Sequence, residues 1–224
     1  NGTIDGGQGE AVRVPLAGST LVPVPGSGHS DDTLRSLLAL SDVMSTGHHA
    51  AVSAEVTKGD IVAVVGDGAV GLSAVLAAKR LGAERIIVLS RHSQRQQLAR
   101  EFGATDVVAE RGTDGIARIM ELTDGVGADA VLECVGTDDA MRTAFEIARP
   151  GSTVGFVGAP HGVVLPVRQM FVNNVGLAGG MAPVRRYLPE LLDLVTSGTV
   201  DPGLVFDSVM PLSQVASVSL ADAR

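Results

Sequence analysis

Residues 61–82 run from an apolar stretch, IVAVV, through three closely spaced glycines into a helical pattern, LSAVLAAKRLG. In such a turn the first glycine (Gly66) permits the tight bend, the second (Gly68) lets backbone approach a pyrophosphate, and the third (Gly71) lets the helix pack on the strand. The helix N-terminus adds amide donors and a positive dipole. The glycine spacing alone fits any tight turn. A strand, turn and helix in this order predict a nucleotide site.

Short apolar runs alternate with helical patterns along most of the chain. This alternation predicts an α/β fold with a doubly wound parallel sheet, because parallel strands need crossover connections. Ser30 followed by two aspartates predicts a helix start. The expected strands are 61–65, 86–89, 106–108, 130–134 and 153–157, with an edge strand at 11–14, a last strand at 204–210, a helix over much of 42–56 and another ending at Gly198.

Composition narrows the class of partner. The formal charge of −8 argues against a nucleic-acid surface, and no apolar run reaches the roughly 18 residues of a membrane span. Partners should therefore be small molecules or other subunits. Cys134 is the only cysteine, which excludes an intrachain disulfide and favours a reducing, cytoplasmic setting.

The residues after the second expected strand indicate which nucleotide the site binds. An NAD site usually places an acid about 20 residues beyond the glycines, and Ser90 stands there. A small hydroxyl leaves room for a 2′-phosphate, and Arg91 offers a planar, charged fork to bind it, with Arg95 adding positive potential. The site therefore favours NADP over NAD, S-adenosylmethionine or FAD. Arg91 as an ordinary loop cation is the alternative, and we expect Asp67 to face outward.

Several segments resemble the medium-chain, zinc-dependent alcohol dehydrogenases, particularly their NADP-using secondary-alcohol branch. They are DGGQGEAVRVP, DVMSTGHHAAVSAEVTKGDIVAVVGDGAVGL, LGAERIIVLSR, ECVG and RPGSTVGFVGAP. The resemblance implies a Rossmann domain at 45–210, preceded by a remnant of a GroES-like catalytic domain with its linking helix at 1–44 and followed by a truncated tail at 211–224.

The resemblance also assigns residues. Asp42 falls where that branch places an aspartate on the catalytic zinc. The matching cofactor positions are Thr46, Val70 and Val157, which line the nicotinamide, and the glycine pair Gly179 and Gly180. His48 and His49 are adjacent in a helix and point about 100° apart, so they cannot both face one metal and are expected to be structural or exposed. Cys134 is expected to be a small buried hydrophobe.

The chain departs from the family pattern at both ends. A catalytic zinc needs three protein ligands, and this sequence offers one, because the family's cysteine and Gly-His-Glu motif lie upstream of the region resembling Asn1. The sequence is therefore either a fragment of a longer enzyme or a cofactor domain that cannot complete a metal site alone.

The implied function is NADP-dependent, zinc-assisted interconversion of an alcohol with an aldehyde or ketone, this chain supplying mainly cofactor binding. A non-catalytic NADP(H)-binding module and a zinc-free quinone reductase remain alternatives. Edge strands near 174–180 and 203–209 allow a homo-oligomer.

Overall fold

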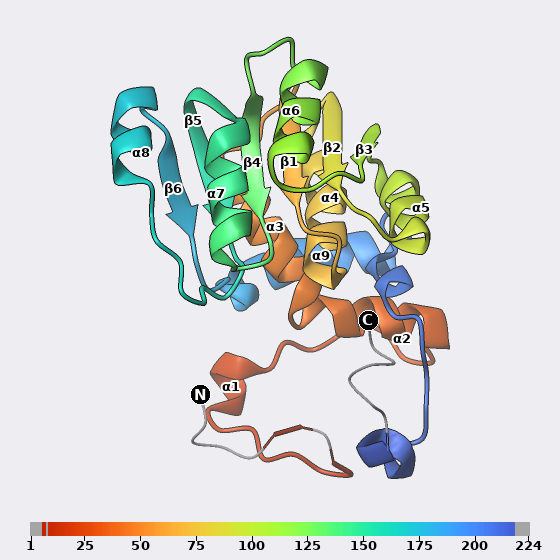
Figure 1. Ribbon diagram of the computed structural model, residues 1–224. Helices are drawn as coiled ribbons and strands as arrows, with labels where there is room; N and C mark the ends of the chain where they lie inside the picture. Colours follow the sequence, from red (N-terminus) through yellow and green to blue (C-terminus); the bar gives the residue numbers. More distant parts are fainter. Residues whose placement is uncertain (1–5, 8, 218–224) are drawn as a thin grey trace. The chain divides into compact units, whose positions relative to one another are not determined.

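The computed structural model describes residues 6, 7 and 9–217 (Figure 1). The chain divides into two compact units. One is His29–Val205, and the other joins the segments before His29 and after Val205. The elements of the nucleotide-type fold all lie in the first unit.

The first unit is built on a six-stranded parallel sheet of order β3-β2-β1-β4-β5-β6. The strands are β1 Ile61–Val65, β2 Arg85–Leu89, β3 Asp106–Val108, β4 Ala128–Glu133, β5 Ala148–Phe156 and β6 Gly176–Gly179. The order reverses between β1 and β4, which is the switch point where open α/β sheets bind ligands. The predicted doubly wound Rossmann fold is confirmed.

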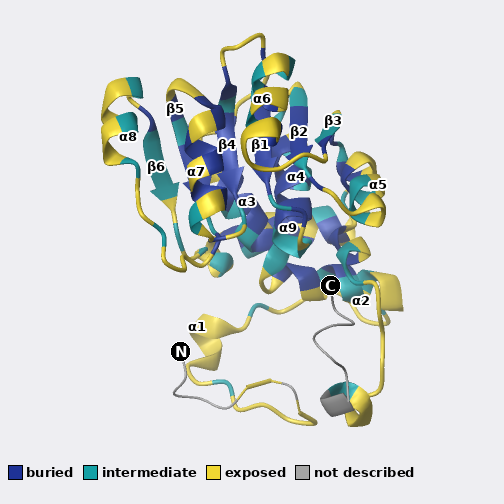
Figure 2. Ribbon diagram, in the orientation of Figure 1, coloured by how far each residue is buried: buried dark blue, intermediate teal, exposed yellow. Residues whose placement is uncertain are grey.

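Helices cover both faces of the sheet (Figure 1). They are α2 Asp31–Leu40, α3 Val43–Ser53, α4 Ala69–Leu81, α5 Ser93–Phe102, α6 Gly112–Leu122, α7 Asp138–Ile147, α8 Val167–Asn173 and α9 Val184–Thr196. Alternate residues of β1 divide between two cores: Val62 and Val64 pack with α3, α4 and α5, whereas Ala63 and Val65 pack with α6 and α7. The central strands are therefore buried on both faces (Figure 2), as strands of a covered parallel sheet must be.

Helix α3 lies unusually close to α4 because Gly47 has no side chain. A Cβ at Gly47 would lie 2.5 Å from the amide nitrogen of Ala74 and 2.8 Å from the carbonyl oxygen of Val70. Sequence reasoning did not single out this glycine, because no local turn or positive φ marks a helical glycine whose role is close packing.

The helix signals at the start of the first unit are confirmed. Ser30 caps α2 by accepting the Thr33 amide at 3.2 Å. Helix α9 ends just before Gly198, which has φ +71°.

Two predicted strands are wrong. Residues 11–14 are irregular, and they precede only the four-residue helix α1, Ala17–Thr20. The segment 204–210 finishes a 3-10 turn, Pro202–Val205, and continues without regular structure. Neither segment pairs with a strand among the described residues, and an alternating pattern forms a strand only where a neighbour completes the hydrogen-bond ladder.

Among the helices that the structure describes, none has both the length and the apolar character needed to cross a membrane.

Candidate functional site

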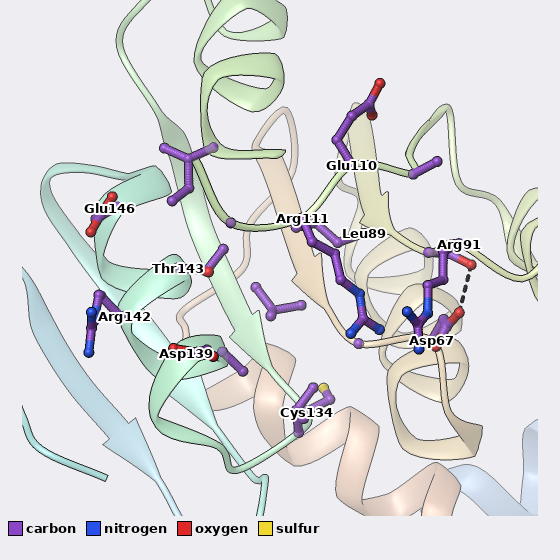
Figure 3. Close-up of a pocket in the computed structure, with 18 of the residues that line it drawn as sticks. Asp67, Leu89, Arg91, Glu110, Arg111, Cys134, Asp139, Arg142, Thr143 and Glu146 are labelled. Atoms are coloured by element: carbon purple, nitrogen blue, oxygen red, sulfur yellow. Dashed lines mark hydrogen bonds between the residues drawn. The ribbon is translucent and has the colours of Figure 1, made fainter. Parts of the chain in front are cut away.

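A pocket of about 690 Å³ opens at the carboxyl edge of the sheet, over the switch point between β1 and β4 (Figure 3). Its floor is the turn after β1, and its walls come from the ends of β2 and β4, residues 109–111 with the start of α6, and one face of α7. Loops at this edge of a parallel sheet are the usual place for a nucleotide. Four of the predicted cofactor residues line the pocket, namely Gly66, Gly68, Ser90 and Arg91.

Glycine is favoured at the three positions of the turn for different physical reasons. Gly66 has φ +116°, which disfavours any residue with a side chain. A Cβ at Gly71 would lie 2.1 Å from the Gly66 carbonyl oxygen, so the third glycine allows the helix to pack on the turn. Nothing lies within 4 Å of a Cβ at Gly68. Packing within the protein therefore does not require glycine there, which leaves the approach of a ligand as the reason.

Asp67 lies inside the site, and the expectation that it faces outward is wrong. The residue is only 9% exposed. Its carboxylate accepts a hydrogen bond from the Ser90 hydroxyl at 2.9 Å, dashed in Figure 3, and pairs with Arg95 at 3.3 Å. A buried carboxylate needs such partners, and the ends of β2 and α5 supply them. Ser90 and Arg95 thus contact the same acid, which the sequence analysis did not predict.

Two arginines of the pocket have no such partner. The side chains of Arg91 and Arg111 extend toward the end of the pocket where Asp67 lies (Figure 3). No ion pair of either residue is found in the part of the chain that the structure describes. Sequence reasoning missed Arg111. A cation three residues after the third strand was a usable signal, because that strand ends at the same edge of the sheet.

Glu133 and Cys134 end β4 beside the pocket. Glu133 is fully buried, and its Oε1 accepts the amides of Val135 and Gly136, each at 2.8 Å. Burial raises the pKa of its carboxyl group, partly offset by these amides, and its Oε2 has no hydrogen-bond partner among the described residues. Burial also raises the pKa of the Cys134 thiol, so the thiolate is disfavoured. Cys134 packs against the core but is only half-buried, because it also lines the pocket.

The residues assigned to the nicotinamide lie outside this pocket. Thr46 is in α3 and Val70 in the first turn of α4. Val157 follows β5 and donates its amide to the Glu133 carbonyl oxygen at 2.9 Å. Gly179 ends β6 with φ +128°, and the Gly180 amide donates to the Phe156 carbonyl oxygen at 2.8 Å.

Asp42, the expected metal ligand, is exposed at the start of α3. Its carboxylate accepts a hydrogen bond from the Thr46 hydroxyl at 3.1 Å, one turn into the helix. Among the described residues, no three His, Cys, Asp or Glu side chains gather where they could share a metal ion.

His48 and His49 have structural partners. His48 is 2% exposed, packs edge-on against Tyr187 and contacts the Arg80 guanidinium at 3.2 Å. Burial and the charge of Arg80 lower the pKa of His48 from 6.5 to about 4. His49 shares a hydrogen bond of 2.9 Å with the Tyr187 hydroxyl. These contacts join α3, α4 and α9, as expected for structural histidines.

Comparison with known proteins shows which family this chain resembles. Residues 69–197 match the family model described as zinc-binding dehydrogenase. A protein of Mycobacterium tuberculosis named a probable zinc-binding alcohol dehydrogenase is 35% identical, covering 96% of this chain and 54% of that protein. The NADP-dependent isopropanol dehydrogenase of Thermoanaerobacter brockii is 37% identical, covering 88% of this chain and 57% of that protein.

Comparison with solved structures gives the same family. Alcohol dehydrogenase TADH from Thermus sp. ATN1 superposes with a TM-score of 0.86 at 30% identity, covering 95% of this chain and 61% of that one. The chain spans about half the length of the curated relatives it matches. Its sheet, its glycine turn and the matched family model all give the same assignment: the chain belongs to the zinc-binding dehydrogenase family.

Proposed function

We propose that this chain supplies the cofactor-binding part of an NADP-dependent, zinc-assisted dehydrogenase that interconverts an alcohol with an aldehyde or ketone. The observation that carries the proposal is the pocket over the switch point, where a glycine turn meets two arginines that have no ion-pair partner among the described residues. NADP-dependent relatives support the choice of cofactor, and NAD is the second candidate.

Different parts of the pocket are proposed to bind different groups of the cofactor. The N-terminus of α4 presents amides and a positive dipole to the pyrophosphate, with Gly68 leaving the approach open. Arg91 and Arg111 provide charge-assisted hydrogen bonds to a 2′-phosphate. A nicotinamide cofactor held in this way would supply the hydride acceptor or donor for the carbinol carbon. The space for the nicotinamide ring is shaped by Thr46, Val70, Val157, Gly179 and Gly180.

Zinc fits the described residues only in part. Asp42 offers a carboxylate near Thr46, and a catalytic zinc needs two more protein ligands. We propose that Asp42 is one ligand and that the other two come from outside the described residues. A zinc held there supplies a Lewis acid for the alcohol oxygen. The role of this chain's residues is to place the cofactor and to contribute that single carboxylate.

Titration calorimetry of the 224-residue chain with NADPH and with NADH tests the proposal. We expect tighter binding of NADPH, and we expect Arg91→Ala to weaken NADPH far more than NADH. Equal weakening of both cofactors by Arg91→Ala would contradict the assignment.

The alternatives are tested by activity. Cofactor binding without turnover in any zinc-loaded form would favour a binding module, and reduction of a quinone by NADPH in the presence of a chelator would favour a quinone reductase.

A homo-oligomer is also proposed, through the exposed edge of β6 and its neighbour α8. Strand β6 pairs with β5 on one side only. Three apolar residues of α8 are 67–87% exposed, namely Val167, Phe171 and Val172. Charge substitution at Phe171 should give a smaller species by sedimentation, and an unchanged mass would refute this interface.

Two sequence-based expectations remain proposals. We assign residues 1–44 to a remnant of a catalytic domain with its linking helix, and residues 211–224 to a truncated C-terminal tail. We also propose a reducing, cytoplasmic location, since the lone Cys134 forms no intrachain disulfide. Fractionation of the source cells would test the second.

A further inference from the structure

The turn after β1 carries an acid, Asp67, close to the end of β2. In this fold the end of β2 usually supplies the acid itself. In an ordinary NAD site an acid at the end of β2 accepts hydrogen bonds from the ribose. Here that position is Ser90, and its hydroxyl lies 2.9 Å from the Asp67 carboxylate. Asp67 therefore brings a carboxylate into the ribose region from the turn after β1.

The direction of the hydrogen bond limits what Ser90 can offer to a ligand. Because Ser90 donates its only hydroxyl proton to Asp67, it presents oxygen lone pairs to the pocket. Lone pairs can accept from a ribose hydroxyl but cannot donate to a phosphate. The Gln96 side chain donates to the Ser90 carbonyl oxygen at 2.6 Å, which fixes this end of β2.

The charges around Asp67 act in opposite directions. Arg91 and Arg111 extend toward this end of the pocket and attract a 2′-phosphate (Figure 3). The Asp67 carboxylate repels it, and Arg95 at 3.3 Å screens that repulsion only partly. The side chain of Asp67 is 12% exposed, so bulk water contributes little additional screening.

We propose that Asp67 is the specificity-determining residue of the adenosine ribose site: it restrains the NADPH preference that Arg91 and Arg111 create, and it keeps NADH usable. This inference rests on the proposed function. Arg111 becomes a second phosphate-binding residue, and Arg95 becomes a positioning residue that acts through Asp67.

The test is titration calorimetry of the 224-residue chain with both cofactors. Asp67→Asn keeps the shape and an oxygen acceptor for Ser90 but removes the charge. We expect NADPH to bind about tenfold more tightly, a change of about 1.4 kcal/mol, while NADH binds equally or more weakly. Asp67→Ser should shift the ratio in the same direction. Arg111→Ala should weaken NADPH and spare NADH.

The two partners of the ion pair give opposite signs, which a merely structural role would not. Arg95→Gln should weaken NADPH in the wild type and have much less effect in the Asp67→Asn background. Asp193→Asn is the matched control: it removes the same charge from an exposed position on α9, away from the pocket, and should change neither affinity.

The outcomes separate the two proposals. If the chain binds NADPH through Arg91 but neither Asp67 variant raises the NADPH to NADH ratio, this inference is overturned and the proposed function stands. If the folded wild-type chain binds neither cofactor, both are overturned. Thermal unfolding of each variant identifies a variant that fails to fold.

Discussion

Alanine substitutions at Gly71 and at Gly68 should have different effects. We expect the first to lower the stability of the fold and the second to weaken cofactor binding. A Cβ at position 71 would lie 2.1 Å from the Gly66 carbonyl oxygen and 2.8 Å from its carbonyl carbon. An ordinary contact is about 3.4 Å or more, so α4 and the turn must separate by roughly 1 Å. Overpacking of backbone against backbone costs about 1–3 kcal/mol. Gly71→Ala should therefore lower the free energy of unfolding by about 2–3 kcal/mol.

Gly68→Ala should behave differently. Gly68 has φ −74° and no atom within 4 Å of an added Cβ, so the folded chain accepts a methyl group there. We expect a change in stability of no more than about 0.5 kcal/mol, since the residue caps α4 and alanine is a poorer cap than glycine. The methyl group would, however, occupy the path of a pyrophosphate, and affinity for both cofactors should fall at least about tenfold.

Urea unfolding followed by circular dichroism measures the first effect, and titration calorimetry measures the second. The reasoning on packing is refuted if Gly71→Ala unfolds at the wild-type midpoint. The reasoning on ligand approach is refuted if Gly68→Ala keeps wild-type affinity for NADPH.

Three further predictions concern the core. The pKa of His48 is lowered to about 4 in the folded state, so the unfolded chain takes up a proton first as pH falls through 6.5; stability should drop between pH 6.5 and 4 by about 2–3 kcal/mol, and urea unfolding of His48→Gln should show a shallower dependence. Gly47→Ala should cost about 2–3 kcal/mol by thermal unfolding, because its Cβ meets the Ala74 amide nitrogen at 2.5 Å, and an unchanged midpoint would contradict the close packing of α3 on α4. Glu133→Ala should cost about 2–4 kcal/mol because it strips the acceptor from two amides, whereas Glu133→Gln keeps an acceptor and should cost less; equal losses would show that the charge matters more than the hydrogen bonds.

The fold could be predicted because its signals are local. The order of strand, glycine turn and helix at 61–82, the cap at Ser30 and the stop at Gly198 each act within a few residues of the chain. The two wrong strands failed because a strand depends on a partner that local pattern does not reveal. At 11–14 and 204–210 the alternation exists, but no ladder forms among the described residues.

The site was predicted in outline but not in its electrostatics. Ser90, Arg91 and Arg95 follow from the end of β2, whereas the partner of Ser90 comes from a different strand end, 23 residues earlier in the chain. A sequence shows that Asp67 stands between two glycines, and only the fold shows that its carboxylate turns toward Ser90. Arg111 was missed for the same reason, since its place in the pocket depends on β3 pairing with β2.

The most direct test of the central claim is a calorimetric titration of the 224-residue chain with NADPH and NADH, repeated with Arg91→Ala. We predict that the wild-type chain binds both cofactors and prefers NADPH, and that Arg91→Ala weakens NADPH far more than NADH. Binding of neither cofactor by the folded chain, or equal weakening of NADPH and NADH by Arg91→Ala, would contradict the account.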